Sequence, residues 1–290
     1  MNTTEFLAIS SAIVPDRLAV IFEEKRLTYE ALSERVNRLA NALANLGIKA
    51  GDRVAMFQVN CNEHIETYFA AAKLDAIYVP LHFRAKADEL AYMLNDAQPL
   101  VIFAGYRYVE LINSIRSDVS SVKHYISLEG NGGNGWEFYD DILASSDSDE
   151  LHFPEANDDD TTILMFTAGT TGIPKGVMLT HNSFSSYILS NVSPVDPETI
   201  ERNILTVPMY HIAGVQAVMA AVYGGRPLIV QRQFDAEGWM ELVEREKASR
   251  AMMVPTMLKQ LMDHPNFHQH DLSSLEVITY GAAPMPLEVI

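Results

Sequence analysis

Short apolar segments alternate with helical patterns over the first half of the chain, and this alternation limits the folds available to it. The predicted strands are 53–59, 77–81, 100–104 and 123–128, and the predicted helices are 63–73, 87–94 and 107–115. Strands separated by helices of this length pair in parallel, because each helix carries the chain back to the starting edge of the sheet. The predicted fold class is therefore α/β, with layered parallel sheets and flanking helices.

One helix pattern is especially regular. After Leu27-Thr28-Tyr29-Glu30, apolar residues recur at alternating spacings of four and three and end at a glycine; they are Leu32, Val36, Leu39, Leu43 and Leu46, followed by Gly47. A single apolar stripe of this kind predicts a helix with one face in the core.

A loop rich in threonine and glycine follows the β-type segment 161–166. Its residues are Thr167, Ala168, Gly169, Thr170, Thr171, Gly172, Ile173, Pro174, Lys175 and Gly176. Hydroxyls, unshielded backbone N–H groups and one lysine charge are what a polyphosphate requires. The Walker loop is excluded, because it needs Gly before the lysine and Ser or Thr after it, where this chain has Pro174 and Gly176. The alternative is a turn between two strands.

This loop resembles the nucleotide-binding signature of the adenylate-forming superfamily, and its acyl-CoA synthetase branch in particular. The sequence departs from that signature once, at Ala168, where a second hydroxyl residue is usual. The resemblance implies an adenylate-forming N-terminal domain in which Thr167, Ala168, Gly169, Thr170, Thr171, Gly172 and Lys175 bind phosphate.

A second segment resembles the same family. The predicted strand 204–208 is followed by Met209-Tyr210-His211-Ile212-Ala213-Gly214, and in the family the histidine of this arrangement lies beside the carboxylate being activated. The resemblance implies a catalytic role for His211 together with Lys175. A lone histidine is otherwise more often structural, and its place between Pro208 and Gly214, downstream of the loop, favours the functional interpretation.

A third segment resembles the turn that packs against adenine. The predicted strand 277–280 continues into small residues that leave room for a flat ring, namely Gly281, Ala282, Ala283 and Pro284. A generic turn from a strand to a helix is the alternative. Where acyl-CoA synthetases often carry a lysine that helps to bind CoA, this chain has Gln233 beside Arg232.

The charge of the chain excludes some partners. A formal net charge of −17 argues against nucleic acid and anionic membrane surfaces, which require a basic face. An anionic nucleotide must therefore be held by local groups, which raises the importance of Lys175, backbone amides and Mg²⁺. The apolar segment 212–223 is too short to span a membrane, and the N-terminus lacks the basic start of a secretory signal. We expect a cytoplasmic protein.

The single cysteine, Cys61, cannot form an intramolecular disulfide, and no His/Cys cluster has zinc spacing. We predict a packed or partly exposed thiol rather than a nucleophile, and we assign no residue of this sequence to a metal.

An acidic segment at 145–160 predicts a solvated connector, and the spacing of an EF-hand is absent from it. We expect a first α/β subdomain at 1–160 and a second at 161–290. The resemblance covers essentially the whole sequence but about the first half of the family's usual length. Segments that in the family hold Mg²⁺ and ribose, the hinge and the C-terminal domain with its lysine lie outside the match.

The resemblance implies that a carboxylic acid, ATP and CoA become acyl-CoA, AMP and pyrophosphate through an acyl-adenylate. The many Met and Val residues favour a hydrophobic acid, and no acid stands in 210–215 to hold an amino group. Two alternatives stay open: a non-catalytic half-molecule that binds nucleotide, and an enzyme that delivers acyl groups to a carrier protein. The resemblance also leaves room for a homodimer.

Overall fold

The computed structural model describes residues 1–167, 173–281 and 284. Ala168, Gly169, Thr170, Thr171 and Gly172 of the predicted phosphate loop, and Ala282 and Ala283 of the predicted adenine turn, lie outside the described residues.

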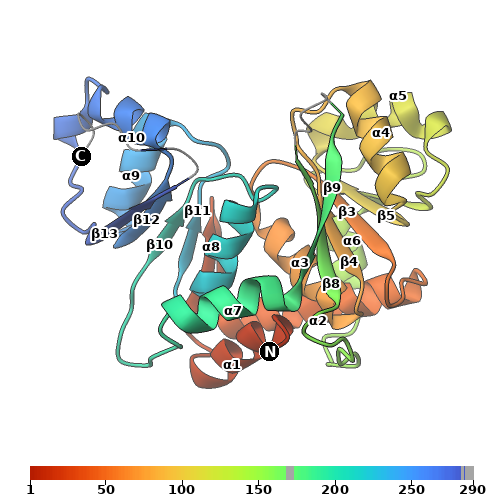
Figure 1. Cartoon of the computed structure of the whole chain (residues 1–290), viewed down its shortest axis with the longest axis horizontal. Coiled ribbons are helices and arrows are strands. Elements are labelled where there is room, and N and C mark those ends of the chain that lie inside the picture. The colour runs from red at the N-terminus through yellow and green to blue at the C-terminus, as the bar shows by residue number, and fades with distance from the viewer. Residues whose placement is uncertain (168–172, 282–283, 285–290) are drawn as a thin grey trace.

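Two sheets organise the described residues (Figure 1). The first has the strand order β7-β6-β5-β3-β4-β8-β9 and is parallel except for β9; the second has the order β13-β12-β10-β11-β1-β2 and is parallel except for β2. The strands are β1 (Leu18–Phe22), β2 (Lys25–Thr28), β3 (Arg53–Phe57), β4 (Ile77–Pro80), β5 (Val101–Ala104), β6 (His124–Ser127), β7 (Glu137–Phe138), β8 (Thr161–Thr167), β9 (Lys175–Thr180), β10 (Asn203–Leu205), β11 (Leu228–Val230), β12 (Arg250–Met253) and β13 (Val277–Tyr280). The expected α/β class with layered parallel sheets is confirmed.

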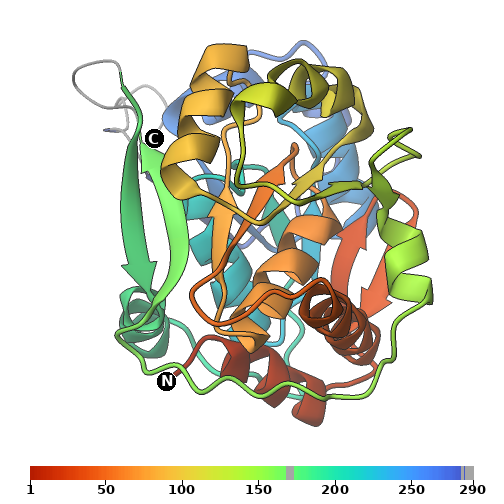
Figure 2. The same ribbon diagram turned by 90° about the vertical axis from the view of Figure 1, so that its right-hand side faces the viewer.

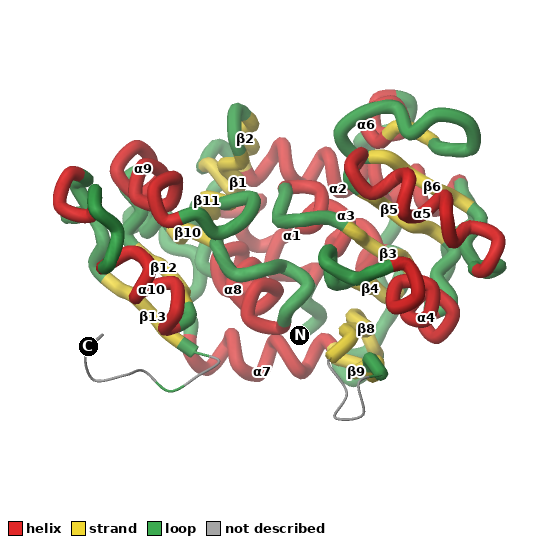
Figure 3. The backbone as a smooth tube through the Cα atoms, turned by 90° about the horizontal axis from the view of Figure 1, so that it is seen from above, coloured by secondary structure: helices red, strands yellow, loops and turns green. Residues whose placement is uncertain are grey.

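Helices cover both faces of each sheet. They are α1 (Thr4–Ile13), α2 (Tyr29–Asn45), α3 (Asn62–Lys73), α4 (Ala87–Ala97), α5 (Val109–Ile115), α6 (Tyr139–Ala144), α7 (His181–Asn191), α8 (Ile212–Tyr223), α9 (Ala236–Glu246) and α10 (Pro255–Met262), with 3₁₀ turns at Tyr106–Tyr108, Arg116–Asp118 and Phe267–Gln269. Figure 3 shows α9 at one side, α4 and α5 at the other, and α1, α3 and α8 between the sheets. The order of layers is helix, sheet, helix, sheet, helix.

The cores follow these layers. The largest cluster joins α1, α2, α3 and α8 to the inner faces of both sheets, and we call these helices the inner layer. Separate clusters pack α4 and α5 on the outer face of the first sheet, and α9 and α10 on the outer face of the second. Successive side chains of a strand point to opposite faces, so Val54 and Met56 face the inner layer while Ala55 and Phe57 face α4 and α5.

The α2 stripe behaves as its spacing predicts. Leu32, Val36, Leu39 and Leu43 are fully buried, and Thr28 caps the helix by accepting a hydrogen bond from the backbone of Ala31. Cys61, just before α3, is buried, and burial raises the pKa of its thiol well above the ordinary value. Of the two alternatives, packed or partly exposed, the structure shows the packed thiol.

The sheets do not divide at residue 160. The β1–β2 hairpin pairs with β11 of the second sheet, and the β8–β9 hairpin pairs with β4 of the first. The subdomains expected at 1–160 and 161–290 therefore do not correspond to the two sheets, because each sheet takes strands from both sides of that boundary. Among the described residues, no helix has both the length and the apolarity that crossing a membrane requires.

Candidate active site

The β8–β9 hairpin holds the two ends of the predicted phosphate loop together. Thr167, the last residue of β8, and Lys175, the first of β9, are opposite each other in the antiparallel ladder. Both residues are exposed, and Lys175 has no ion-pair partner among the described residues. Figure 2 shows the hairpin along one edge of the molecule. The lysine charge is therefore available to a ligand at the end of the hairpin.

His211 lies at the N-terminus of α8, immediately after the turn that follows β10. Its backbone N–H donates to the carbonyl of Pro208 at 3.1 Å. A Cβ on Gly214 would come within 2.3 Å of that same carbonyl oxygen. The turn can close onto the first turn of α8 only because residue 214 has no side chain. The spacing of Pro208, His211 and Gly214 thus has a steric reason.

The exposed His211 ring lies beside a cluster of aromatic rings. The Tyr210 ring lies 4.3 Å from the His211 ring between centroids, and 4.7 Å from the ring of His82, which it meets edge-on. Phe83 packs against Tyr210 at 5.5 Å. His82 and Phe83 follow β4, so they join the segment after β10 at the carboxyl ends of parallel strands, where ligands of open α/β sheets bind.

A cavity of about 490 Å³ connects these two elements. Its lining comes from the hairpin, from α4 and from the segments after β4 and β10: His82, Glu89, Met93, Met165, Phe166, Thr167, Pro174, Val177, Leu179, Tyr210, His211 and Ile212. The structure thus brings Thr167 and one flank of the predicted phosphate loop to the same cavity as His211. Most of the other lining side chains are apolar, and Glu89 supplies the one carboxylate among the described lining residues.

The two imidazoles of this cavity favour their neutral forms. Burial lowers the pKa of His211 below the ordinary value of about 6.5, and the neighbouring His82 lowers it further. Burial also lowers the pKa of His82, against a smaller opposing effect of Glu89. A neutral imidazole carries one ring N–H, so His211 can still donate a hydrogen bond to a carboxylate.

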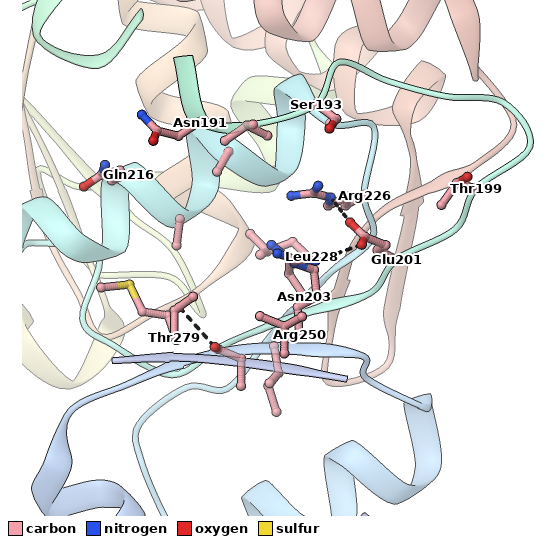
Figure 4. A pocket seen from close by; sticks show the side chains of 18 of the residues that line it. Asn191, Ser193, Thr199, Glu201, Asn203, Gln216, Arg226, Leu228, Arg250 and Thr279 are labelled. Atoms are coloured by element: carbon pink, nitrogen blue, oxygen red, sulfur yellow. Dashed lines mark hydrogen bonds and ion pairs between the residues drawn. The ribbon is translucent and has the colours of Figure 1, made fainter. Parts of the chain in front are cut away.

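A second cavity, of about 570 Å³, runs beside α8 and the inner face of the second sheet (Figure 4). Gln216, Ala217 and Ala220 of α8 line one side, and Met252 and Thr279 of the sheet line another. At one end Glu201 bridges two arginines, with 2.7 Å to the Nε of Arg226 and 2.8 Å to the Nη1 of Arg250. This cavity has both small apolar and polar side chains along α8 and ends at a cluster in which one carboxylate pairs with two guanidinium groups.

The predicted adenine turn is only partly described. Gly281 follows β13, and neither it nor Pro284 is among the described residues that line either cavity. Their neighbours Thr279 and Tyr280 line the second cavity. Contacts of Gly281 and Pro284 with adenine stay predictions.

Arg232, which stands near the position of the family's CoA-binding lysine, has partners within the chain. Its Nε donates to Glu23 at 2.8 Å, its Nη1 pairs with Glu129, and its guanidinium lies over the Phe22 ring. The two carboxylates raise the pKa of Arg232. Arg232 thus ties the β1–β2 hairpin to the loop after β6.

Sequence reasoning missed His82 and Phe83, which pack against Tyr210, and Asn60, whose Oδ1 accepts a hydrogen bond from the backbone N–H of Met209. No periodic pattern marks them, and they lie far from His211 in the sequence. The one available signal was their position directly after predicted strands, since the carboxyl ends of parallel strands meet at one edge.

Comparisons with known proteins agree with this geometry. The AMP-binding enzyme family matches residues 8–290. The chain is 33% identical to the long-chain-fatty-acid–CoA ligase FadD13 of Mycobacterium tuberculosis and 28% identical to the indoleacetate–CoA ligase of Aromatoleum aromaticum. Each match covers 100% of this chain and 57% of the relative, so the chain spans a little over half the length of these curated relatives.

A solved structure extends the comparison to the fold. The inhibitor-bound N-terminal domain of FACL13 from Mycobacterium tuberculosis superposes with a TM-score of 0.90 at 32% identity, covering 100% of this chain and 72% of that one. Fold and sequence therefore agree that the chain belongs to the AMP-binding enzyme family.

Proposed function

We propose that this chain is the N-terminal part of an ATP-dependent acyl-CoA synthetase, an AMP-forming acid–thiol ligase. The cavity that brings Thr167 and Pro174, on either side of the predicted phosphate loop, together with His211 carries the proposal, and Lys175 follows Pro174 at the start of β9. Adenylation must bring the phosphates of ATP and a carboxylate together, and this cavity borders both groups predicted to bind them.

In the proposed first step a carboxylate oxygen attacks the α-phosphorus of ATP. The new bond joins that oxygen to phosphorus, the bond from the α-phosphorus to the bridging oxygen breaks, and pyrophosphate leaves with the bonding electrons. In the second step a thiol sulfur attacks the acyl carbon, AMP leaves, and the thiol proton passes to solvent. No oxidant or reductant is needed.

The chain's own residues ease the approach of two anions. Lys175 supplies positive charge at the end of the hairpin, where it opposes the charge of the phosphates. His211, whose lowered pKa favours the neutral imidazole at pH 7, would donate a hydrogen bond from its ring N–H to the carboxylate and help to orient it. Among the described lining residues, Glu89 alone carries a carboxylate that would be available to Mg²⁺, which proteins usually bind through one or two carboxylates together with substrate phosphates. Bound Mg²⁺ would neutralise phosphate charge.

The lining of the cavities supports a hydrophobic acid. Met93, Met165 and Ile212 border the first cavity, and Ala217 and Ala220 border the second along α8. The two relatives named above act, by their names, on long-chain fatty acids and on indoleacetate, which are both largely apolar acids. We propose an acid with a hydrophobic body.

CoA is the proposed acceptor, and a carrier protein is the alternative. The ligase names of the relatives favour CoA. Arg232 is already paired with Glu23 and Glu129, so we do not assign it to the phosphates of the acceptor. Comparing CoA with a phosphopantetheinylated carrier protein as acceptor of the acyl group distinguishes the two.

The proposal is tested by acid-dependent exchange of pyrophosphate into ATP, with a panel of short, long and aromatic acids, alongside calorimetric titration of AMP. We expect exchange with hydrophobic acids. Binding of AMP without exchange would favour the non-catalytic half-molecule, and adding a separate C-terminal fragment would then test whether a missing domain restores turnover. Neither binding nor exchange, before or after that addition, would contradict the proposed function.

A further inference from the structure

We propose that Asn60 is the positioning residue for His211: its buried amide fixes the backbone of the segment that carries the histidine. The inference rests on the proposed function for its catalytic consequence. Its structural part, the coupling between Asn60 and His211, is tested without any activity.

The first step of the argument is the set of contacts made by the Asn60 side chain. Its Oδ1 accepts a hydrogen bond from the backbone N–H of Met209 at 2.8 Å. Its Nδ2 donates to the carbonyls of Val207 at 3.1 Å, Gln231 at 3.2 Å and Thr206 at 3.5 Å. The residue is 3% exposed. The side-chain amide of Asn60 thus contacts four buried backbone groups, with its two N–H hydrogens shared among three carbonyl oxygens.

The second step is the place of Asn60 in the fold. It follows β3 in the first sheet, whereas Thr206 and Val207 follow β10, and Gln231 follows β11, in the second sheet. The backbone N–H of Asn60 also donates to the carbonyl of Arg232 at 3.2 Å. Asn60 thus links the two sheets where the carboxyl ends of their parallel strands meet, beside the candidate active site.

The third step leads from Met209 to His211. The Met209 side chain is 3% exposed and packs among His64, Tyr78 and Val218 of the inner layer and β4. The turn from Pro208 to His211 is closed by a backbone hydrogen bond and has no room for a Cβ at Gly214. A shift of the Met209 backbone is therefore passed on to His211, because the turn between them cannot absorb it.

The chemistry of the contacts specifies an amide. Three carbonyl oxygens face Nδ2 and need a donor, whereas one N–H faces Oδ1 and needs an acceptor. A carboxylate at this position would place an oxygen against three carbonyl oxygens. A hydroxyl is too short to reach both groups. Asn60→Asp and the milder Asn60→Ser therefore both displace the segment.

Asn41 provides a matched control. It is 5% exposed, and its Nδ2 donates to the carbonyls of Asp147 at 2.8 Å and Asp149 at 3.0 Å. It is thus another buried asparagine that holds backbone carbonyls, but it ties α2 to the acidic connector and has no contact with the segment before His211.

The first experiment follows the nine histidines of the 290-residue chain by NMR of ¹⁵N-labelled imidazoles, with His211 assigned through His211→Gln. We expect Asn60→Ser to shift the His211 resonances and to move the midpoint of their pH titration, while Asn41→Ser leaves both at their wild-type values. Asn60→Asp should move them further if it folds. Unchanged His211 signals in folded Asn60→Ser would overturn the proposal.

The second experiment tests the catalytic consequence with a double-mutant cycle. Asn60→Ser should lower acid-dependent exchange by about 10- to 100-fold, the loss expected for misplacing a catalytic group by a fraction of an ångström to 1 Å. In the His211→Gln background the same change should lower exchange by less than about twofold, because there is no histidine to misplace. Equal losses in both backgrounds would show a merely structural role. Wild-type protein without exchange would count against the proposed function, while the NMR result would still decide the coupling.

Discussion

The segment that carries His211 and the hairpin that carries Lys175 differ in how the fold supports them. His211 is the N-cap residue of α8, and although its side chain is exposed, the segment before it is held between the two sheets by Asn60 and by the close backbone approach at Gly214. Lys175 lies on the β8–β9 hairpin, whose second strand is exposed over its first four residues, with Met178 at 71%. The histidine is held by the core and the lysine by a surface ribbon. Changes in the inner layer should therefore alter stability, and changes on the hairpin should alter binding and activity.

The largest expected loss comes from a buried ion pair of the inner layer. The Nε of Arg35 on α2 contacts the fully buried carboxylate of Glu66 on α3 at 2.9 Å. Arg35→Ala leaves that charge without its partner and should lower the free energy of unfolding by about 3–5 kcal/mol. Arg38 lies one turn further along α2 and bonds to the backbone carbonyl of Ser146. Arg38→Ala should lower the free energy of unfolding, measured by urea denaturation, by much less. Similar losses for the two variants would contradict a special role for the inner-layer pair.

A smaller loss of stability is expected when the pH is lowered. His64 is 2% exposed, and burial lowers its pKa to about 4. Between about pH 6.5 and pH 4 the unfolded chain binds a proton that the folded chain does not, so stability falls as the pH falls. Over this window His64 should contribute a loss of up to about 3 kcal/mol, at about 1.4 kcal/mol per pH unit. The free energy of unfolding of His64→Gln, measured with urea across this pH window, should depend less on pH than that of the wild type. Parallel pH curves for the two proteins would refute the role of His64.

The next largest loss of stability should follow from a steric change at the turn from Pro208 to His211. Gly214→Ala places a Cβ 2.3 Å from the Pro208 carbonyl oxygen and should destabilise the chain by about 1–3 kcal/mol. Gly281→Ala is the control, since its Cβ would lie 3.7 Å from Met252, an ordinary contact, and should change stability by less than about 0.5 kcal/mol. Thermal unfolding compares the two. Wild-type stability in Gly214→Ala would mean that the turn is looser than its geometry indicates.

The smallest change in stability should accompany a large change in activity. Lys175→Ala on the exposed hairpin should alter the free energy of unfolding by less than about 0.5 kcal/mol. The same substitution should lower acid-dependent exchange about 100-fold, because it removes a charge that opposes the phosphates. Lys49→Ala, an exposed lysine before β3 at the opposite end of that sheet, should change neither quantity. Unchanged exchange in Lys175→Ala would refute the loop assignment.

Local patterns predicted the fold where a segment has one buried side. The α2 stripe and the strands β3, β4, β5 and β6 fall where their spacing and apolar runs indicate. Helix α8 has no such pattern, because it lies between two sheets and is apolar on nearly every side, and it was noted only as an apolar segment. The pairing of β1 with β11 was also not foreseen, since it depends on long-range contacts that no local pattern records.

For the candidate site the same distinction holds. Thr167, Lys175 and His211 were predicted because they stand in recognisable segments, and the structure brings Thr167 and His211 to one cavity. His82 and Asn60 were not predicted, because each contacts a residue more than a hundred positions away in the chain. Their roles become visible only when the two sheets are placed side by side.

The β1–β2 hairpin, from the start of the chain, belongs to the sheet that is otherwise built from late strands, and this affects co-translational folding. Val20 in β1 pairs with Leu228 in β11, so this hairpin emerges from the ribosome long before its partner exists. At the usual rates of synthesis the interval is roughly 10–40 s. Throughout it, the paired edge of the nascent β1 has no sheet to join. Translation speed and chaperones that shield exposed strand edges are therefore expected to influence the yield of folded protein more than the stability of the finished chain does.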